Sequence, residues 1–561
     1  MRITHIHIEH FRSIKLLDFE PGPYCVLVGE NNAGKSNILK ALNLLLGETW
    51  PSDRSFSEED FFDQDTSKEI VIRLRFDSFI EEARNNYTMQ VGGLELRCKA
   101  YKRRVKDKPA GTLSVDFVCI DPRGRELKYP PQPLRKETKP EGFWPVLRVS
   151  SALREQVASM IYVGVLREYD RHAPGSRWSV LRRLFNEVNT EFLSDRTKLK
   201  ITQPDGQKIE LTRREAFEAS VRDAYQYLRT ESFREIERLL AANAVEQMGL
   251  DKTTDKVELH FEGHDPTNAY KALQLYVDQL GIRSPASEVG AGLQSAIVVA
   301  IFRTYEELRK EGAIFALEEP EVFLHPQKAR YFATVLRSLA ERGNQVFITT
   351  HSPIFVQIDQ PENLALVRRT QADGTMVRQA AKIDFAPDDR RALRLLTEFD
   401  TQRNELFFAR RVLLVEGNTE KLLLPLVFQL LGTDINREGV SVIECGGKTK
   451  IPLFARAAKA MDIPFVVLAD HDIQAIQDGW SETRRARQEE RNRDHERWNR
   501  ELLQEVGDDR IFWLDPALED VLGLPREESQ KIDRALQWGL NLTRDGIPTS
   551  LRAPIERLLA I

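Results

Sequence analysis

The segment that most restricts the fold of this chain is residues 29–36, which read G-E-N-N-A-G-K-S. An apolar run at 24–28 precedes it, and residues 37–42 continue with the apolar spacing of a helix. A G-x-x-x-x-G-K-S sequence between a predicted strand and a predicted helix is typical of a phosphate-binding loop, in which backbone N–H groups surround the phosphates. A glycine-rich turn with an unrelated lysine is the alternative, but it does not explain both flanks. We therefore predict that the loop binds ATP and that Ser36 also binds Mg²⁺. The predicted ATP-binding residues are Asn31, Asn32, Ala33, Gly34, Lys35, Ser36 and Asn37.

The composition indicates a soluble protein of several domains. At 561 residues the chain is too long for one ordinary hydrophobic core, and 41% hydrophobic with 30% charged residues suits a folded protein in water. No apolar run reaches the length of a membrane span, and residues 1–6 read as a strand and not as a signal peptide. The four cysteines form neither a disulfide framework nor a metal motif, so we expect a cytoplasmic protein without membrane contact. The net charge of −5 neither requires nor excludes nucleic acid.

The spacing of apolar residues divides the chain into four regions. Residues 1–150 read mainly as strands around the phosphate-binding loop, and residues 256–395 return to strands and helices. Between them, residues 151–255 have the three- and four-residue apolar spacing of helices. We interpret them as a helical insertion that pairs with a second copy of the chain, with a plain helical cap as the alternative. A second α/β unit follows over residues 405–561.

Two further motifs lie at the ends of predicted strands. The apolar run 313–317 leads directly into Glu318 and Glu319, and the carboxyl end of a strand is where α/β sheets bind ligands. Glu318 would hold Mg²⁺ through water, and Glu319 could polarise the water that attacks the γ-phosphate. A solvated acidic turn is the alternative, but such a turn seldom follows an apolar run directly. The strand 345–350 leads into His351, which could contact the γ-phosphate, although an isolated histidine is usually structural.

A helix predicted to open with Gly290, Gly292 and Gln294 offers another anion-receptive N-terminus. The phosphate-binding loop, G-x-G-x-Q, L-E-E-P-E and T-H-S-P, in this order, resemble the ATPase heads of the ABC superfamily, in its SMC and RecF-like branch. The resemblance implies that these three residues of one protomer complete the ATP site of another. The chain departs from the pattern at Glu318, where the superfamily usually has Asp, and it matches the usual L-S-G-G-Q signature only in part.

Two apolar strands of the last region each lead into acidic residues. One is followed by Glu416 and, one helical turn later, by Glu420, and the other by Asp470 and Asp472. A parallel sheet would place both clusters at one edge, and an extended segment would place both aspartates on one side. Converging carboxylates repel unless a metal neutralises them, and oxygen ligands favour Mg²⁺ or Mn²⁺. Two ions about 4 Å apart could hold a phosphodiester and activate water; an acidic surface edge is the alternative.

The V-E-G-x-x-E and D-x-D motifs resemble the Toprim domain of topoisomerases, primases and several nucleases. The segment L-D-P-A-L-E-D-V-L resembles a later acidic element of one Toprim branch, which implies Glu519, or else Asp520, as a further metal ligand. An ABC-type head followed by a Toprim domain resembles the OLD (overcoming lysogenization defect) family over essentially the whole chain. This implies an α/β protein: an ABC/SMC-like ATPase head with an inserted helical dimerisation region, followed by a Toprim parallel-sheet domain.

The family resemblance implies a homodimer or dimer of dimers that binds ATP and cuts DNA with Mg²⁺ or Mn²⁺, in phage defence or DNA processing. The implied catalytic residues are Glu319, His351, Glu416, Asp470 and Asp472. A helicase partner is left open. One alternative is a RecF/SMC-like DNA-binding ATPase clamp with a non-cleaving, regulatory Toprim domain. Another is a Toprim primase or a strand-passage enzyme, but strand passage needs a nucleophilic tyrosine on a separate domain, and we identify no such domain.

Two features of the last region stay undecided. Some relatives use a lysine near the C-terminus in catalysis, and Arg552, Lys421 or Lys448 would have to supply that group here. Residues 483–503 form a predicted helix rich in Arg and Glu, with opposite charges at i, i+4 spacing. For this helix we favour a solvated surface over a DNA contact.

Overall fold

The computed structural model describes all residues except 48, 85, 102–110, 130–143, 158, 166–178, 203–207, 248–271, 280, 309–311, 358, 380–384, 398–400 and 526–530. The chain forms two compact units, Met1–Val165 with Lys310–Ile561, and Leu166–Arg309. The first unit contains the predicted phosphate-binding loop and all the acidic strand ends. The second unit contains much of the predicted helical insertion and also Gly290, Gly292 and Gln294, which the sequence groups with the later ATPase region.

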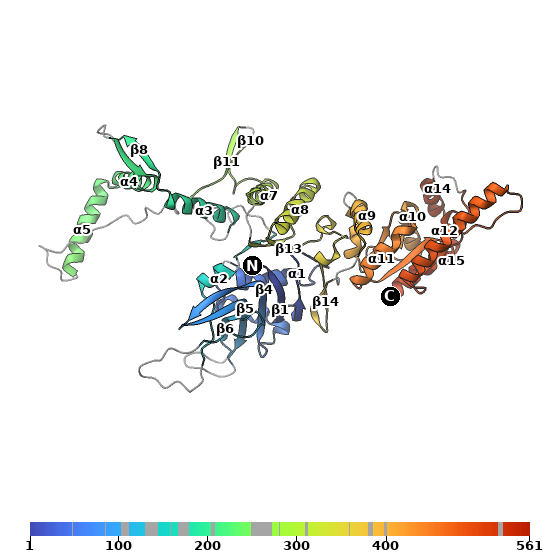
Figure 1. The fold of residues 1–561 in the computed structure, drawn as a ribbon, viewed down its shortest axis with the longest axis horizontal. Coiled ribbons are helices and arrows are strands. Elements are labelled where there is room, and N and C mark those ends of the chain that lie inside the picture. Colours follow the sequence, from blue (N-terminus) through green and yellow to red (C-terminus); the bar gives the residue numbers. More distant parts are fainter. Residues whose placement is uncertain are drawn as a thin grey trace. The chain divides into compact units, whose positions relative to one another are not determined.

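The larger sheet of the first unit has eleven strands among the described residues. In sheet order these are β6 (Leu113–Ile120), β5 (Tyr87–Ala100), β4 (Ile70–Arg84), β1 (Ile3–Phe11), β2 (Ile14–Phe19), β15 (Gly374–Gln379), β14 (Leu364–Thr370), β3 (Tyr24–Val28), β13 (Gln345–Thr349), β12 (Ala313–Glu318) and β7 (Ser159–Val163). The strands from β14 to β7 pair in parallel, whereas those from β6 to β15 are antiparallel. Figure 1 shows the antiparallel strands β1, β4, β5 and β6 as one blue layer.

The parallel strands bring motifs from distant parts of the sequence together. β3, β13 and β12 are buried along their whole length, as expected for parallel strands covered on both faces. β13 lies between β3 and β12, and all three run in the same direction. Their carboxyl ends therefore lie at one edge of the sheet, and these ends lead into Gly29, His351 and Glu319.

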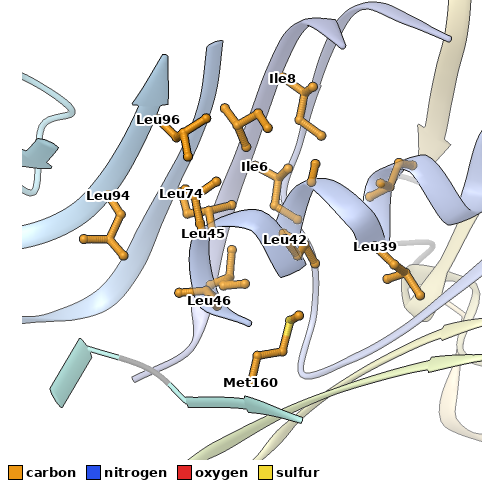
Figure 2. Packing of buried hydrophobic residues seen from close by; sticks show 14 of the residues in the cluster. Ile6, Ile8, Leu39, Leu42, Leu45, Leu46, Leu74, Leu94, Leu96 and Met160 are labelled. Carbon is orange, nitrogen blue, oxygen red and sulfur yellow. The ribbon is translucent and has the colours of Figure 1, made fainter. Parts of the chain in front are cut away.

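The helix α1 (Lys35–Leu46), which follows the loop, forms the core of the head with the antiparallel strands. Its apolar residues recur every three or four positions and are fully buried: Ile38, Leu39, Leu42, Leu45 and Leu46. Figure 2 shows Leu39, Leu42, Leu45 and Leu46 facing β1, β4 and β5, with Met160 of β7 beside them. Burying a side chain of this size contributes roughly 1.5–3 kcal/mol, so this packing fixes the helix that carries the loop. The other helices of the head are α2 (Ser151–Val157), α8 (Pro326–Glu341) and α9 (Pro387–Thr397).

The second sheet of the first unit has four parallel strands, in the order β17 (Val440–Glu444), β16 (Arg411–Val415), β18 (Phe465–Asp470) and β19 (Ile511–Leu514). The helices with it are α10 (Asn418–Leu430), α11 (Ile451–Ala460), α12 (Glu482–Val506), α13 (Leu518–Leu522), α14 (Lys531–Leu540) and α15 (Thr549–Ala560). The predicted parallel sheet is confirmed. The two acidic motifs follow the neighbouring strands β16 and β18 at the same edge.

The described part of the second unit is mainly helical and also contains two antiparallel pairs of strands. Its helices are α3 (Val180–Ser194), α4 (Arg213–Tyr227), α5 (Glu231–Gln247) and α7 (Ala291–Glu307), and its strands are β8 (Lys198–Thr202), β9 (Lys208–Thr212), β10 (Tyr276–Gln279) and β11 (Ile282–Pro285). The helical character predicted for residues 151–255 is therefore wrong at β7, which belongs to the larger sheet of the first unit. It is also wrong at β8 and β9, where apolar residues alternate over short segments and favour an antiparallel strand pair.

No helix in the described part of the chain is long and apolar enough to cross a membrane. All four cysteines are buried, and none is in a disulfide bond.

We predict that Gly29→Ala destabilises the protein more than Gly432→Ala does. Both glycines have positive φ angles, +149° and +83°. A Cβ at Gly432 would meet no atom of the described residues within 4 Å, so this substitution should cost only the strain of the backbone conformation, about 1–2 kcal/mol. A Cβ at Gly29 would lie 2.1 Å from the backbone oxygen of Val367 in β14, which cannot move without disturbing the sheet. Scanning calorimetry checks this, and equal melting temperatures for the two variants would contradict it.

Candidate functional site

The phosphate-binding loop has the conformation that its glycines and its lysine require. Gly34 precedes α1 with a φ of 106°, and Asn32 has a φ of 62°. The buried Nζ of Lys35 donates to the backbone oxygens of Gly29 (2.8 Å) and Glu30 (2.9 Å) and lies 3.0 Å from Nε2 of His351. Burial lowers the pKa of Lys35. An ammonium held by neutral acceptors in this way can exchange them for phosphate oxygens at little cost.

Two hydroxyl groups that the sequence did not identify brace the loop from outside. The Oγ1 of Thr375 donates to the backbone oxygen of Ala33 (2.8 Å) and lies 2.7 Å from Oγ of Ser13. The side-chain amide of Asn37 donates to the same Ser13 oxygen (2.8 Å). Asn37 was predicted as a nucleotide-binding residue, and in the structure its side chain fixes Ser13 against the first turn of α1.

The acidic end of β12 lies beside the loop. Glu318 is buried, and its Oε1 has no hydrogen-bond partner among the described residues, which suits a ligand to a magnesium-bound water. Glu319 has a φ of 43°, and its N–H donates to the backbone oxygen of Thr349 (2.7 Å), so strand pairing fixes this turn. Its Oε1 lies 3.9 Å from Nε2 of His351. Burial, and then the nearby Lys35 ammonium, lower the pKa of His351 and favour the neutral ring.

Glu321 is a residue of this site to which the sequence assigned no role. Its Oε1 accepts hydrogen bonds from the hydroxyl of Thr350 (2.8 Å) and the N–H of His351 (2.9 Å). These bonds hold the turn after β13 and so set the direction of the His351 ring.

The loop also contacts the segment that leads into β16. Arg410 Nε donates to Glu30 Oε1 (2.5 Å), and this hydrogen bond lowers the pKa of Glu30. A few residues earlier, the side-chain amide of Asn404 donates to the backbone oxygens of Pro353 (3.2 Å) and Val356 (3.1 Å), directly after His351.

Gly290, Gly292 and Gln294 lie in the second unit, at the start of α7. Gly290 and Gly292 are exposed, and the amide of Gln294 donates to the backbone oxygens of Ser287 (3.0 Å) and Val289 (2.9 Å).

The second site is a cluster of three carboxylates at the edge of the smaller sheet. Glu416, Asp470 and Asp472 each place a carboxylate oxygen within 4.8 Å of the other two. Glu416 Oε1 accepts from the N–H of Asp470 (2.8 Å), and Asp470 Oδ1 accepts from the N–H of Leu518 (2.8 Å). These bonds direct the carboxylates toward one another, which is how a divalent cation would be held.

The cluster is electrostatically costly without a cation. Burial raises the pKa of Glu416 to about 7, and burial together with Glu416, Glu420 and Asp472 raises the pKa of Asp470 to about 8. Uncompensated buried charges protonate or bind a cation. The residues therefore fit a divalent metal with oxygen ligands.

Asp472 reaches the cluster by a route other than the one predicted. The chain is not extended beyond Asp470, where β18 ends, because Asp472 has a φ of 60° and donates its N–H to the backbone oxygen of Pro516 (2.6 Å). The extended geometry inferred from the two-residue spacing is therefore wrong, although the two carboxylates do converge. Two cationic or ionisable groups lie against Asp472 Oδ2: Lys448 Nζ at 2.8 Å and His495 Nδ1 at 3.5 Å.

Among the three basic candidates, only Lys448 lies at the cluster. Lys421 Nζ donates to Gln402 Oε1 (2.8 Å), and Arg552 donates to the backbone oxygen of Arg544 (2.9 Å). Lys448 is buried and follows the Gly446-Gly447 turn that comes after β17.

The other predicted metal ligands lie outside this cluster of three. Glu420 and Glu519 are buried, and Glu519 forms an ion pair with Lys531. Burial raises the pKa of Glu420, and the charge of Lys531 opposes this rise. Asp520 is exposed. Glu420 still contributes to the raised pKa of Asp470, so it lies within electrostatic reach of the cluster.

Comparison with known proteins finds similarity over both sites. Residues 25–357 match the family described as an AAA domain, putative AbiEii toxin, type IV TA system, and residues 407–472 match the overcoming lysogenization defect protein-like TOPRIM domain. An OLD nuclease of Thermus scotoductus is 33% identical over 99% of this chain and 98% of its own length. The Old nuclease of Escherichia phage P2 is 24% identical over 84% of this chain and 77% of its own, and the endonuclease GajA of Bacillus cereus is 20% identical over 85% and 76%.

We predict that, in the absence of metal, the melting temperature falls as the pH rises from about 5 to about 8. The pKa of Glu416 is raised to about 7 and that of Asp470 to about 8, so the folded chain keeps protons that the unfolded chain has already released. Where the folded state binds more protons, stability decreases with rising pH. The substitution Asp470→Asn should flatten this slope, because an amide does not titrate.

The measurement is a series of thermal melts in EDTA for the wild type and Asp470→Asn. Adding Mg²⁺ at pH 8 should raise the melting temperature of the wild type more than that of the variant. If the melting temperatures of the two proteins changed identically with pH, the carboxylate cluster would not be the source of the pH dependence.

Proposed function

The chain belongs to the OLD nuclease family, and from this premise we propose that it is an ATP-regulated DNA endonuclease that depends on a divalent metal. As a member of this family with an AAA-type ATPase domain and a Toprim domain, it is an ATPase and a nuclease. The observation that carries the finer proposal is the convergence of Glu416, Asp470 and Asp472 at the edge of the Toprim sheet.

The Toprim residues support cleavage of a phosphodiester. Mg²⁺ or Mn²⁺ bound by Glu416, Asp470 and Asp472 would neutralise the phosphate and supply an activated water. Lys448, whose ammonium lies 2.8 Å from Asp472, places a positive charge beside the same position, where it can stabilise the charge that develops on the phosphate oxygens. Glu420, Glu519 and Asp520 are proposed as ligands of a second ion.

The head is proposed to bind ATP with Mg²⁺ through the predicted loop residues and Glu318. Glu319 would accept a proton from the attacking water, and His351, held by Glu321, would contact the γ-phosphate. We propose that Gly290, Gly292 and Gln294 of a second copy complete this site, so that the chain works as a homodimer or a dimer of dimers. Defence against phage is the proposed setting, with DNA as the substrate.

We predict that supercoiled plasmid is nicked in Mg²⁺ or Mn²⁺ and that Asp470→Ala abolishes this. The bound metal stabilises the transition state by several kcal/mol. Removing one of its ligands should therefore lower the cleavage rate by about a thousandfold. The matched control is Asp533→Ala, which removes an exposed aspartate of α14 and should cut normally. The absence of nicking by the wild type under every metal and nucleotide condition would instead favour a DNA-binding clamp with a non-cleaving Toprim domain.

A second prediction concerns the head. Glu319→Gln should slow ATP hydrolysis about a hundredfold, because it removes a proton acceptor, while leaving ATP affinity near that of the wild type. Lys35→Ala should weaken ATP binding itself. Steady-state phosphate release and binding of a fluorescent ATP analogue separate the two effects. Wild-type turnover by Glu319→Gln would assign the water-activating role to another residue.

A further inference from the structure

One face of α12 is polar where it meets the Toprim fold. The residues at helical spacing on this face are Gln488, Asn492, His495, Asn499, Leu502 and Val506, all buried or half-buried. A helix usually presents an apolar stripe to its own domain, and a buried amide is costly unless it is hydrogen-bonded. Leu502 and Val506 follow this rule, so the polar half of the stripe needs a separate explanation.

The amides of this stripe hold the backbone on both sides of Asp472. Asn499 Nδ2 donates to the backbone oxygen of His471 (2.8 Å). Asn492 makes two bonds to Gln474, accepting from its N–H (3.2 Å) and donating to its backbone oxygen (2.8 Å). Gln488 Nε2 in turn donates to Asn492 Oδ1 (2.9 Å) and fixes the orientation of that amide. α12 therefore anchors the segment immediately before and after the aspartate.

This anchoring matters because of the conformation of Asp472. Its φ of 60° lies in a sparsely populated region for a residue with a side chain, and such a conformation persists only where the surroundings determine it. The N–H of Asp472 is fixed from one side by Pro516, whereas the neighbouring carbonyl of His471 points to Asn499. If the segment left this left-handed conformation, the direction of the Asp472 carboxylate relative to Glu416 and Asp470 would change.

We propose that Asn499 and Asn492 are positioning residues of the metal site, which set the geometry of Asp472 without touching metal or substrate. The inference rests on the proposed metal-dependent nuclease function and assigns a role to α12 beyond a solvated helix. Residues that orient metal ligands in this way typically change metal affinity by about 10- to 100-fold when substituted.

The test is calorimetric titration of the full-length protein with Mn²⁺, in the absence of nucleotide and DNA. Asn499→Asp keeps the shape of the side chain, but its carboxylate cannot donate to the His471 oxygen. We expect its Kd for Mn²⁺ to rise at least about tenfold. Cleavage by this variant should approach the wild-type rate at saturating Mn²⁺, because the substitution weakens Mn²⁺ binding and not the cleavage step. The matched control, Glu496→Ala on the exposed face of the same helix, should bind as the wild type does.

Asn492→Ala provides a second variant at a less buried position, and thermal melts and ATP hydrolysis report whether each protein is folded. If Asn499→Asp does not fold, Asn492→Ala decides the question. Wild-type affinity for Mn²⁺ in the folded variants overturns the positioning role. Asp470→Asn serves as the reference without a Toprim site: if it binds Mn²⁺ as tightly as the wild type, the proposed metal site itself fails, and that outcome is distinct from failure of the positioning role.

Discussion

Parallel pairing between strands that are distant in the sequence is the constraint on which both sites depend. In the head, β3 near the start of the chain pairs with β13, and β13 pairs with β12, so that the phosphate-binding loop, His351 and Glu319 meet at one edge. In the Toprim domain, β16 and β18 pair in the same way and bring Glu416 to Asp470. Because parallel strands must be joined by crossover connections, each site collects residues from several segments.

The two sites bury side chains of opposite charge. At the loop, a buried lysine is held by neutral carbonyl groups and one histidine, and its lowered pKa reflects the lack of water around it. At the Toprim edge, three carboxylates face one buried lysine, and the pKa values of Glu416 and Asp470 rise. The first arrangement is suited to an anion and the second to a cation. A polyanion such as ATP or DNA with its metal ions satisfies both.

The sequence predicted the sheet classes and the strand ends that carry the motifs, because an apolar run followed by glycine or carboxylates is a local signal. It could not predict contacts that depend on long-range packing. Ser13, in the turn between β1 and β2, and Thr375, in β15, brace the loop from opposite ends of the head sequence. Glu321 differs from its acidic neighbours only in its hydrogen-bond partners. The left-handed turn at Asp472 lies in a loop and left no signal in the sequence. The amides of Asn492 and Asn499 left none either, because they lie in a helix whose composition suggested only a charged surface.

The contact between Glu30 and Arg410 has a consequence for genetics. Glu30 belongs to the phosphate-binding loop, and Arg410 directly precedes β16, the strand that leads into Glu416. A substitution of Glu30 therefore removes the side-chain partner of Arg410 together with a side chain of the phosphate-binding loop. Epistasis between the two residues would arise from shared geometry alone, so a joint loss of both activities in such a variant would be no sign that hydrolysis energy drives cutting.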